Sequence, residues 1–144
     1  MIQSDAILPE TSNSGVLYSR EFFALVREAL KPGGYYVMWA PTQRAVETFA
    51  EVFPHVVHVR PASVLIGSVT PIAFDSDALA ARLSDRPISD YLQDAGADLT
   101  TLRANFSGQP RHWSPADRRL GSDSNTDLFP RDEFYLNNRI SGAR

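Results

Sequence analysis

The sequence has no cysteine, which excludes disulfide bonds, a cysteine nucleophile and a metal site built on thiolates. Histidine is scarce as well. Of the three histidines, His55 and His58 lie in one short apolar run and His112 lies far along the chain, so they do not form a ligand pattern. We therefore expect no metal site.

Long hydrophobic runs are also lacking. No stretch approaches the roughly 20 apolar residues of a membrane helix, and the N-terminus lacks the basic and apolar regions of a secretory signal. The formal net charge of −3 gives no reason to expect nucleic acid as a partner. These absences predict a cytoplasmic protein with no membrane segment in this chain.

What is present suits one modest α/β domain, since 43% of the 144 residues are hydrophobic. Residues 20–30 carry apolar side chains at helical spacing, after Ser19 as a cap and before a stop at Pro32, Gly33 and Gly34. Residues 35–40 form a continuous apolar run, which predicts a strand buried on both faces. A second helix is expected after Thr42, with its buried positions at Val46, Phe49, Ala50 and Phe53.

Two further strands are predicted at residues 56–59 and 64–66, on either side of Arg60 and Pro61, and this last pair suits an antiparallel arrangement. After Pro71 we expect short helices at 76–83, 89–93 and 98–105, followed by a docked, irregular tail. The predicted organisation is a partial Rossmann-like core at 1–75, a helical extension at 76–106 and an irregular tail at 107–144. Within the tail, Arg111, Arg118 and Arg119 lie near Trp113, a combination that suits phosphate or nucleic-acid binding. Asp117 and Asp123 offset their charge, however, and favour a solvated segment.

An ordered set of short motifs runs through the first half of the chain. Asp5 and Pro9 lie in a loop, Leu17 and Tyr18 follow, then "EFF" at 21–23 and "LKPGG" at 30–34. Further on come "LIGSVTPIAFD" at 65–75 and "NTDLFPRDEFYLNN" at 125–138. This set resembles the C-terminal half of the polyamine aminopropyltransferases, the spermidine synthase family, in a divergent branch. The resemblance implies an α/β fold: the C-terminal half of a methyltransferase-like Rossmann fold with a mixed sheet, followed by short helices and an irregular tail.

The resemblance also implies a reaction, the transfer of an aminopropyl group from decarboxylated S-adenosylmethionine to a polyamine-type amine. It makes Asp5 the catalytic carboxylate, which would orient the amine and accept its proton. The alternative is that Asp5 only caps a turn. Leu8, Pro9, Glu10 and Tyr18 become candidate substrate-binding residues.

Two of these candidates leave alternatives open. Leu8 stands where the family has its second aspartate, which makes putrescine doubtful as the substrate, although Glu10 lies close enough in sequence to compensate. Tyr18 either lines the amine pocket or is a core aromatic that bridges the loop and the following helix. Residues that hold the cofactor are not identified.

The family's glycine-rich nucleotide loop is absent, because no G-x-G-x-x-G occurs in the sequence. The resemblance therefore predicts a fragment or an N-terminally truncated reading frame. Its expected partner is the missing N-terminal half, or a second copy bound through an exposed sheet edge. An alternative function is that of a non-catalytic remnant, which acts as a protein-interaction or assembly module.

Overall fold

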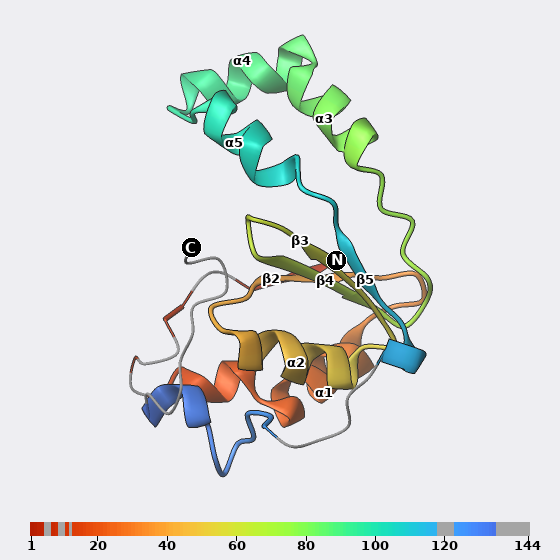
Figure 1. Ribbon diagram of the computed structural model, residues 1–144, viewed down its shortest axis with the longest axis vertical. Helices are drawn as coiled ribbons and strands as arrows, with labels where there is room; N and C mark the ends of the chain where they lie inside the picture. Colours follow the sequence, from red (N-terminus) through yellow and green to blue (C-terminus); the bar gives the residue numbers. More distant parts are fainter. Residues whose placement is uncertain (5–6, 9–10, 12, 118–122, 135–144) are drawn as a thin grey trace.

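The computed structural model describes residues 1–4, 7–8, 11, 13–117 and 123–134 (Figure 1). Among them, five strands form one sheet in the order β1-β2-β4-β3-β5. The strands are β1 (Ile2–Gln3), β2 (Tyr36–Trp39), β3 (His55–Val59), β4 (Val64–Ser68) and β5 (Arg111–Trp113). β1 and β2 are parallel, whereas β4 runs antiparallel to both β2 and β3, and β5 runs antiparallel to β3. The predicted α/β fold with a mixed sheet is confirmed.

Helices α1 (Arg20–Ala29) and α2 (Gln43–Val52) lie together on one side of the sheet (Figure 1). Both begin at the predicted caps: the Ser19 hydroxyl accepts the Phe22 N–H at 3.1 Å, and the Thr42 hydroxyl accepts the Ala45 N–H at 3.0 Å. α1 ends before the predicted stop, where Gly33 adopts a φ of 70°. Local sequence signals thus define both helices.

Helices α3 (Ser76–Ser84), α4 (Arg86–Asp94) and α5 (Leu99–Phe106) project away from the sheet (Figure 1). They match the predicted short helices, except that α4 begins earlier than expected, with Pro87 in its first turn. Short 3₁₀ helices η1 (Gly15–Tyr18), η2 (Pro115–Asp117) and η3 (Arg131–Phe134) complete the structure. No helix among the described residues is long and apolar enough to cross a membrane.

Aromatic rings dominate the core between the sheet and the helices α1 and α2. The rings of Phe49 and Phe53 stack with centroids 4.5 Å apart, and Phe23 and Tyr36 pack against Phe49 at 5.2 and 5.6 Å. Gly67 of β4 allows this packing, because a Cβ there would lie 2.6 Å from Phe53 and 2.7 Å from Phe49. A glycine in the middle of a strand is explained by the rings that press on its backbone.

The opposite face of the sheet corrects one prediction. The run at residues 35–40 was expected to form a strand buried on both faces, but only Tyr36 and Met38 are buried, whereas Val37 and Trp39 are half-buried. Val37 lies opposite Ile66, and Trp39 lies opposite Val64, both also half-buried. The prediction was wrong because α1 and α2 cover the same face, which leaves an apolar patch of these four residues on the other.

β5 corrects a second prediction, since residues 111–113 were assigned to the irregular tail. Trp113 instead lies opposite Val56 of β3 and is half-buried against the core. The guanidinium of Arg111 lies 3.6 Å from the centre of the Trp113 ring, within the range of a cation–π contact. Arg111 and Trp113 are therefore part of the sheet rather than of a solvated segment, while Arg118 and Arg119 lie outside the described residues.

Candidate functional site at the carboxyl edge of the sheet

The carboxyl ends of β1, β2 and β3 meet at one edge of the sheet, because all three strands run in the same direction. α1 and α2 both begin at this edge, and so does the loop that leads from β1 to η1 (left in Figure 1). In open α/β sheets, ligands bind outside the carboxyl ends of the strands. This edge is therefore the candidate site.

The side chains of Ser14 and Tyr18 hold the described part of the loop at the carboxyl edge of the sheet. The Tyr18 hydroxyl donates a hydrogen bond to the carbonyl of Ile7. The Ser14 hydroxyl bonds to the carbonyls of Leu8 and Thr11, at 2.7 and 2.5 Å. With its backbone held in this way, the loop presents Leu8 outward, and this residue is 52% exposed. Leu8 thus offers an apolar surface at the rim of the candidate site.

The other predicted site residues have different outcomes. Asp5, Pro9 and Glu10 lie outside the described residues. Tyr18 is buried in the core and bridges the loop and the start of α1, as in the second alternative that its sequence position allowed. A contact between Tyr18 and an amine stays a prediction.

The C-terminal segment 123–134 docks at the same edge; a docked, irregular tail was predicted, but its position at this edge was not. Its Asp127 carboxylate accepts a hydrogen bond from the Ser19 hydroxyl at the start of α1, and its backbone N–H bonds to Glu21 at 3.1 Å. Glu133 accepts the Asn13 N–H at 3.0 Å. The segment has aromatic residues but no regular period, so neither a helix nor a strand pattern could reveal where it docks.

A buried ionic cluster fixes the segment to α2. Arg44 forms ion pairs with Asp132 and, at 2.9 Å, with Asp123. The Asp132 side chain is completely buried and also accepts hydrogen bonds from Thr42 at 2.5 Å and Asn125 at 2.8 Å. Asp132 lies at the N-terminus of α2, where the positive end of the helix dipole stabilises a negative charge. These contacts tie the C-terminal segment to the N-terminus of α2.

The pKa values in the cluster reflect its charges. Burial lowers the pKa of Arg44, but hydrogen bonds with Asp123 and Asp132 outweigh burial and raise the pKa above its ordinary value. The hydrogen bond from Arg44 is the main reason that the pKa of Asp123 is lowered, and Arg131 adds to it. Arg44 and Asp123 therefore stay charged at neutral pH and serve as an anchor of the segment.

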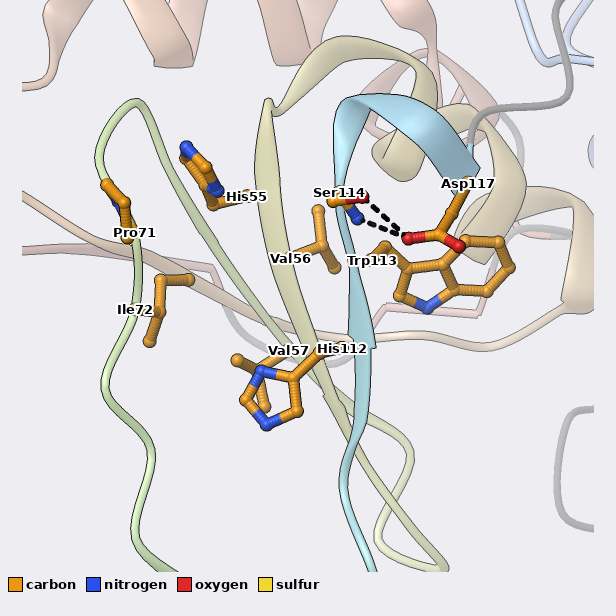
Figure 2. Close-up of a pocket in the computed structure, with 9 residues that line it drawn as sticks. All are labelled: His55, Val56, Val57, Pro71, Ile72, His112, Trp113, Ser114 and Asp117. Atoms are coloured by element: carbon orange, nitrogen blue, oxygen red, sulfur yellow. Dashed lines mark hydrogen bonds between the residues drawn. The ribbon is translucent and has the colours of Figure 1, made fainter.

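A hollow with a volume of about 210 Å³ lies at the opposite end of the sheet, where β3 begins and β5 ends (Figure 2). It is lined by His55, Val56, Val57, Pro71, Ile72, His112, Trp113, Ser114 and Asp117. Its carboxylate, Asp117, already accepts hydrogen bonds from the backbone and hydroxyl of Ser114, both at 2.8 Å, and the backbone bond is the main cause of its lowered pKa. The described residues contain no group of three or more acidic or histidine side chains that could hold a metal ion. This hollow contains the imidazoles of His55 and His112, but it lies at the start of β3, away from the carboxyl ends of the strands where α/β sheets bind their ligands, so we do not take it as the candidate site.

His58 lies on β3 facing the helices and is only 5% exposed. Its Nε2 has no hydrogen-bond partner among the described residues. Burial, together with the charges of Arg60 and Arg111, lowers the pKa of His58 to about 4. This histidine is neutral in the folded protein at pH 7, and its protonation is a source of acid instability.

As the pH falls from 6.5 to about 4, we expect the free energy of unfolding to decrease by up to about 3 kcal/mol. The reason is that over this range His58 binds a proton in the unfolded chain but not in the folded protein. This stability is fully present above the ordinary pKa of 6.5 and is lost as the pH falls toward 4. The variant His58→Leu should lack this part of the pH dependence. Urea unfolding at pH 7 and pH 4.5 measures it, with the exposed His112→Leu as the control. Equal pH dependence in His58→Leu and wild type would contradict the prediction.

In comparisons with known proteins, no family model matches this chain, and no curated protein is significantly similar to it.

Proposed function

We propose that this chain is the catalytic C-terminal half of an aminopropyltransferase-type domain, which transfers an aminopropyl group from decarboxylated S-adenosylmethionine to an amine. The observation that carries the proposal is the position of the loop between β1 and η1. It starts at the carboxyl edge of a parallel strand pair, directly beside the starts of α1 and α2. This is where an α/β sheet binds its ligands, and it is the loop that holds the predicted base Asp5.

In the proposed reaction, the amine nitrogen attacks the carbon next to the sulfonium. A C–N bond forms, the C–S bond breaks, and the electron pair leaves with sulfur as neutral methylthioadenosine. An amine has a pKa of about 10 and is mostly protonated at pH 7, so it must lose a proton before it can attack. Asp5 would attract the ammonium group, orient it and accept this proton.

Leu8 restricts the amine in this proposal. Two carboxylates could hold the two ammonium groups of a diamine, but the exposed Leu8 offers only hydrocarbon where the second one would stand. We therefore favour an acceptor with one recognised amino group over putrescine. Glu10 remains the residue that could replace the second carboxylate.

The edge of the sheet supports a partner that supplies the nucleoside-binding half. β1 is the outermost strand of the described sheet, and residues 1–4 contain no charged side chain of the kind that protects free edges. The neighbouring apolar patch of Val37, Trp39, Val64 and Ile66 is only half-buried. Further strands beside β1, with helices over this patch, would bury both features.

The test is to co-express the chain with the polypeptide encoded directly upstream of it and to measure methylthioadenosine release from decarboxylated S-adenosylmethionine, with and without an amine. We expect a complex that releases methylthioadenosine only when the amine is present. A complex without release, for any amine tested, would instead favour the second candidate, an assembly module. The observation that favours this candidate is the same open edge and apolar patch. A chain that forms no complex, and has no nucleotide loop encoded upstream, would contradict the proposed function.

A further inference from the structure

The C-terminal segment holds the candidate site loop through one carboxylate. The Asn13 backbone N–H donates a hydrogen bond to Oε1 of Glu133 at 3.0 Å, across 120 positions of the sequence. Asn13 has a φ of 64°, in the left-handed region, which asparagine tolerates better than most residues. An external acceptor at this turn stabilises a backbone shape that the local sequence alone would adopt less readily.

Gly15 shows how closely the loop and the segment approach each other. A Cβ at this position would lie 2.7 Å from Cβ of Pro130 and 2.9 Å from Oε2 of Glu133. Both distances are too short for a real side chain, so only a glycine allows Pro130 and Glu133 to pack against the loop here. The contact therefore depends on Gly15 in η1 and on Pro130 and Glu133 in the segment.

Glu133 is held in place independently of the loop. Its neighbour Asp132 is completely buried and paired with Arg44, and the Asp132 backbone N–H bonds to the Asn125 side chain at 3.2 Å. On the loop side, the residue after Asn13 is Ser14, whose hydroxyl bonds to the carbonyl of Leu8. A continuous series of contacts thus leads from the buried anchor through Glu133 to the outward-facing part of the loop.

We propose that Glu133 is a positioning residue of the candidate site: through Asn13 it fixes the described residues of the loop between β1 and η1, namely 7–8, 11 and 13–14, at the carboxyl edge. The proposal rests on the proposed function for the role of this loop. It assigns the C-terminal segment to the site rather than to a docked tail. Glu133 does not touch the reacting atoms, because its Oε1 is directed at the loop backbone.

Hydrogen exchange of the full chain tests this inference with two substitutions and a control. Glu133→Ala removes the hydrogen-bond acceptor, whereas Glu133→Gln keeps an acceptor oxygen on a side chain of the same shape. The control, Glu51→Ala, removes a different contact of the segment, the 2.5 Å hydrogen bond from the Ser124 hydroxyl, which does not involve the loop. We expect the Asn13 amide to exchange about tenfold faster in Glu133→Ala, as the loss of one hydrogen bond to a charged group implies. Glu133→Gln should restore most of the protection, and Glu51→Ala should leave the Asn13 amide unchanged.

Unchanged exchange at Asn13 in Glu133→Ala would overturn the inference, and so would a glutamine variant that exchanges as fast as the alanine variant. Amides of β2 and β3 report global unfolding, and Glu133→Gln decides the question if the alanine variant does not fold. In the complex that releases methylthioadenosine, Glu133→Ala should lower kcat more than it raises KM. Loss of loop protection in a chain that never releases methylthioadenosine would uphold the positioning contact and reject the proposed function.

Discussion

Replacing Asp132 by alanine is expected to lower the free energy of unfolding by about 3–5 kcal/mol, the usual effect of breaking a buried ion pair by removing one partner. The Asp132 side chain is completely buried, and the Arg44 side chain is only 6% exposed. Without Asp132, the almost completely buried guanidinium loses one of its two carboxylates. Thr42 and Asn125 lose an acceptor at the same time, which adds to the cost.

Urea unfolding of Asp132→Ala and Asp123→Ala measures this effect with a matched control. Asp123 also pairs with Arg44, but it is 46% exposed, so its loss should lower the free energy of unfolding by about 1 kcal/mol or less. The double variant Arg44→Met with Asp132→Leu should regain much of the stability, because no charge is then buried alone. A loss for Asp132→Ala as small as that for Asp123→Ala would show that the cluster does not anchor the C-terminal segment.

In the complete domain, Asp5→Asn should lower turnover by about 10²–10⁴-fold, the usual contribution of a general base. The amide keeps the shape of the carboxylate but has neither the charge that attracts an ammonium group nor the basicity to accept its proton. The affinity for decarboxylated S-adenosylmethionine should change little, since the nucleoside-binding loop is expected in the partner half. Methylthioadenosine release under saturating amine measures turnover, and calorimetric titration measures the nucleoside affinity.

Glu10→Gln, in the same loop, is the matched control for Asp5→Asn. It should keep its rate within about threefold of wild type unless Glu10 supplies the second carboxylate that Leu8 lacks. If Asp5→Asn also kept its rate within about threefold, Asp5 would be a turn residue, as the alternative interpretation of the sequence holds.

The parts of the fold that the sequence predicted are those with local causes. Ser19 and Thr42 begin their helices by bonding to N–H groups three residues ahead, and the run around Tyr36 is recognisable within a few positions. β5 escaped prediction because three residues are too short for a periodic pattern, and because its stability comes from pairing with β3, more than 50 positions earlier.

The candidate site was only half predictable for the same reason. The loop was found through an ordered set of motifs in one stretch of sequence. The position of the C-terminal segment at this site was not predicted, because its anchors join residues far apart: Arg44 is 88 positions from Asp132, and Asn13 is 120 positions from Glu133. A charged residue near the start of a helix, such as Arg44, normally points to solvent, so nothing in its neighbourhood indicates a buried partner.

Gly67 has a consequence for how this sequence can diverge. Because the rings of Phe49 and Phe53 pack directly against the backbone of Gly67, an alanine or larger residue at 67 cannot be accepted while both rings remain. Substitution at position 67 is therefore tied to positions 49 and 53: in homologous chains, a side chain at 67 should occur together with a smaller residue at 49 or 53. Such coupled changes at positions 49, 53 and 67 would be a signature of this core. The signature does not depend on any motif in the loop, so homologous chains should keep it even where the residues of the candidate site have changed.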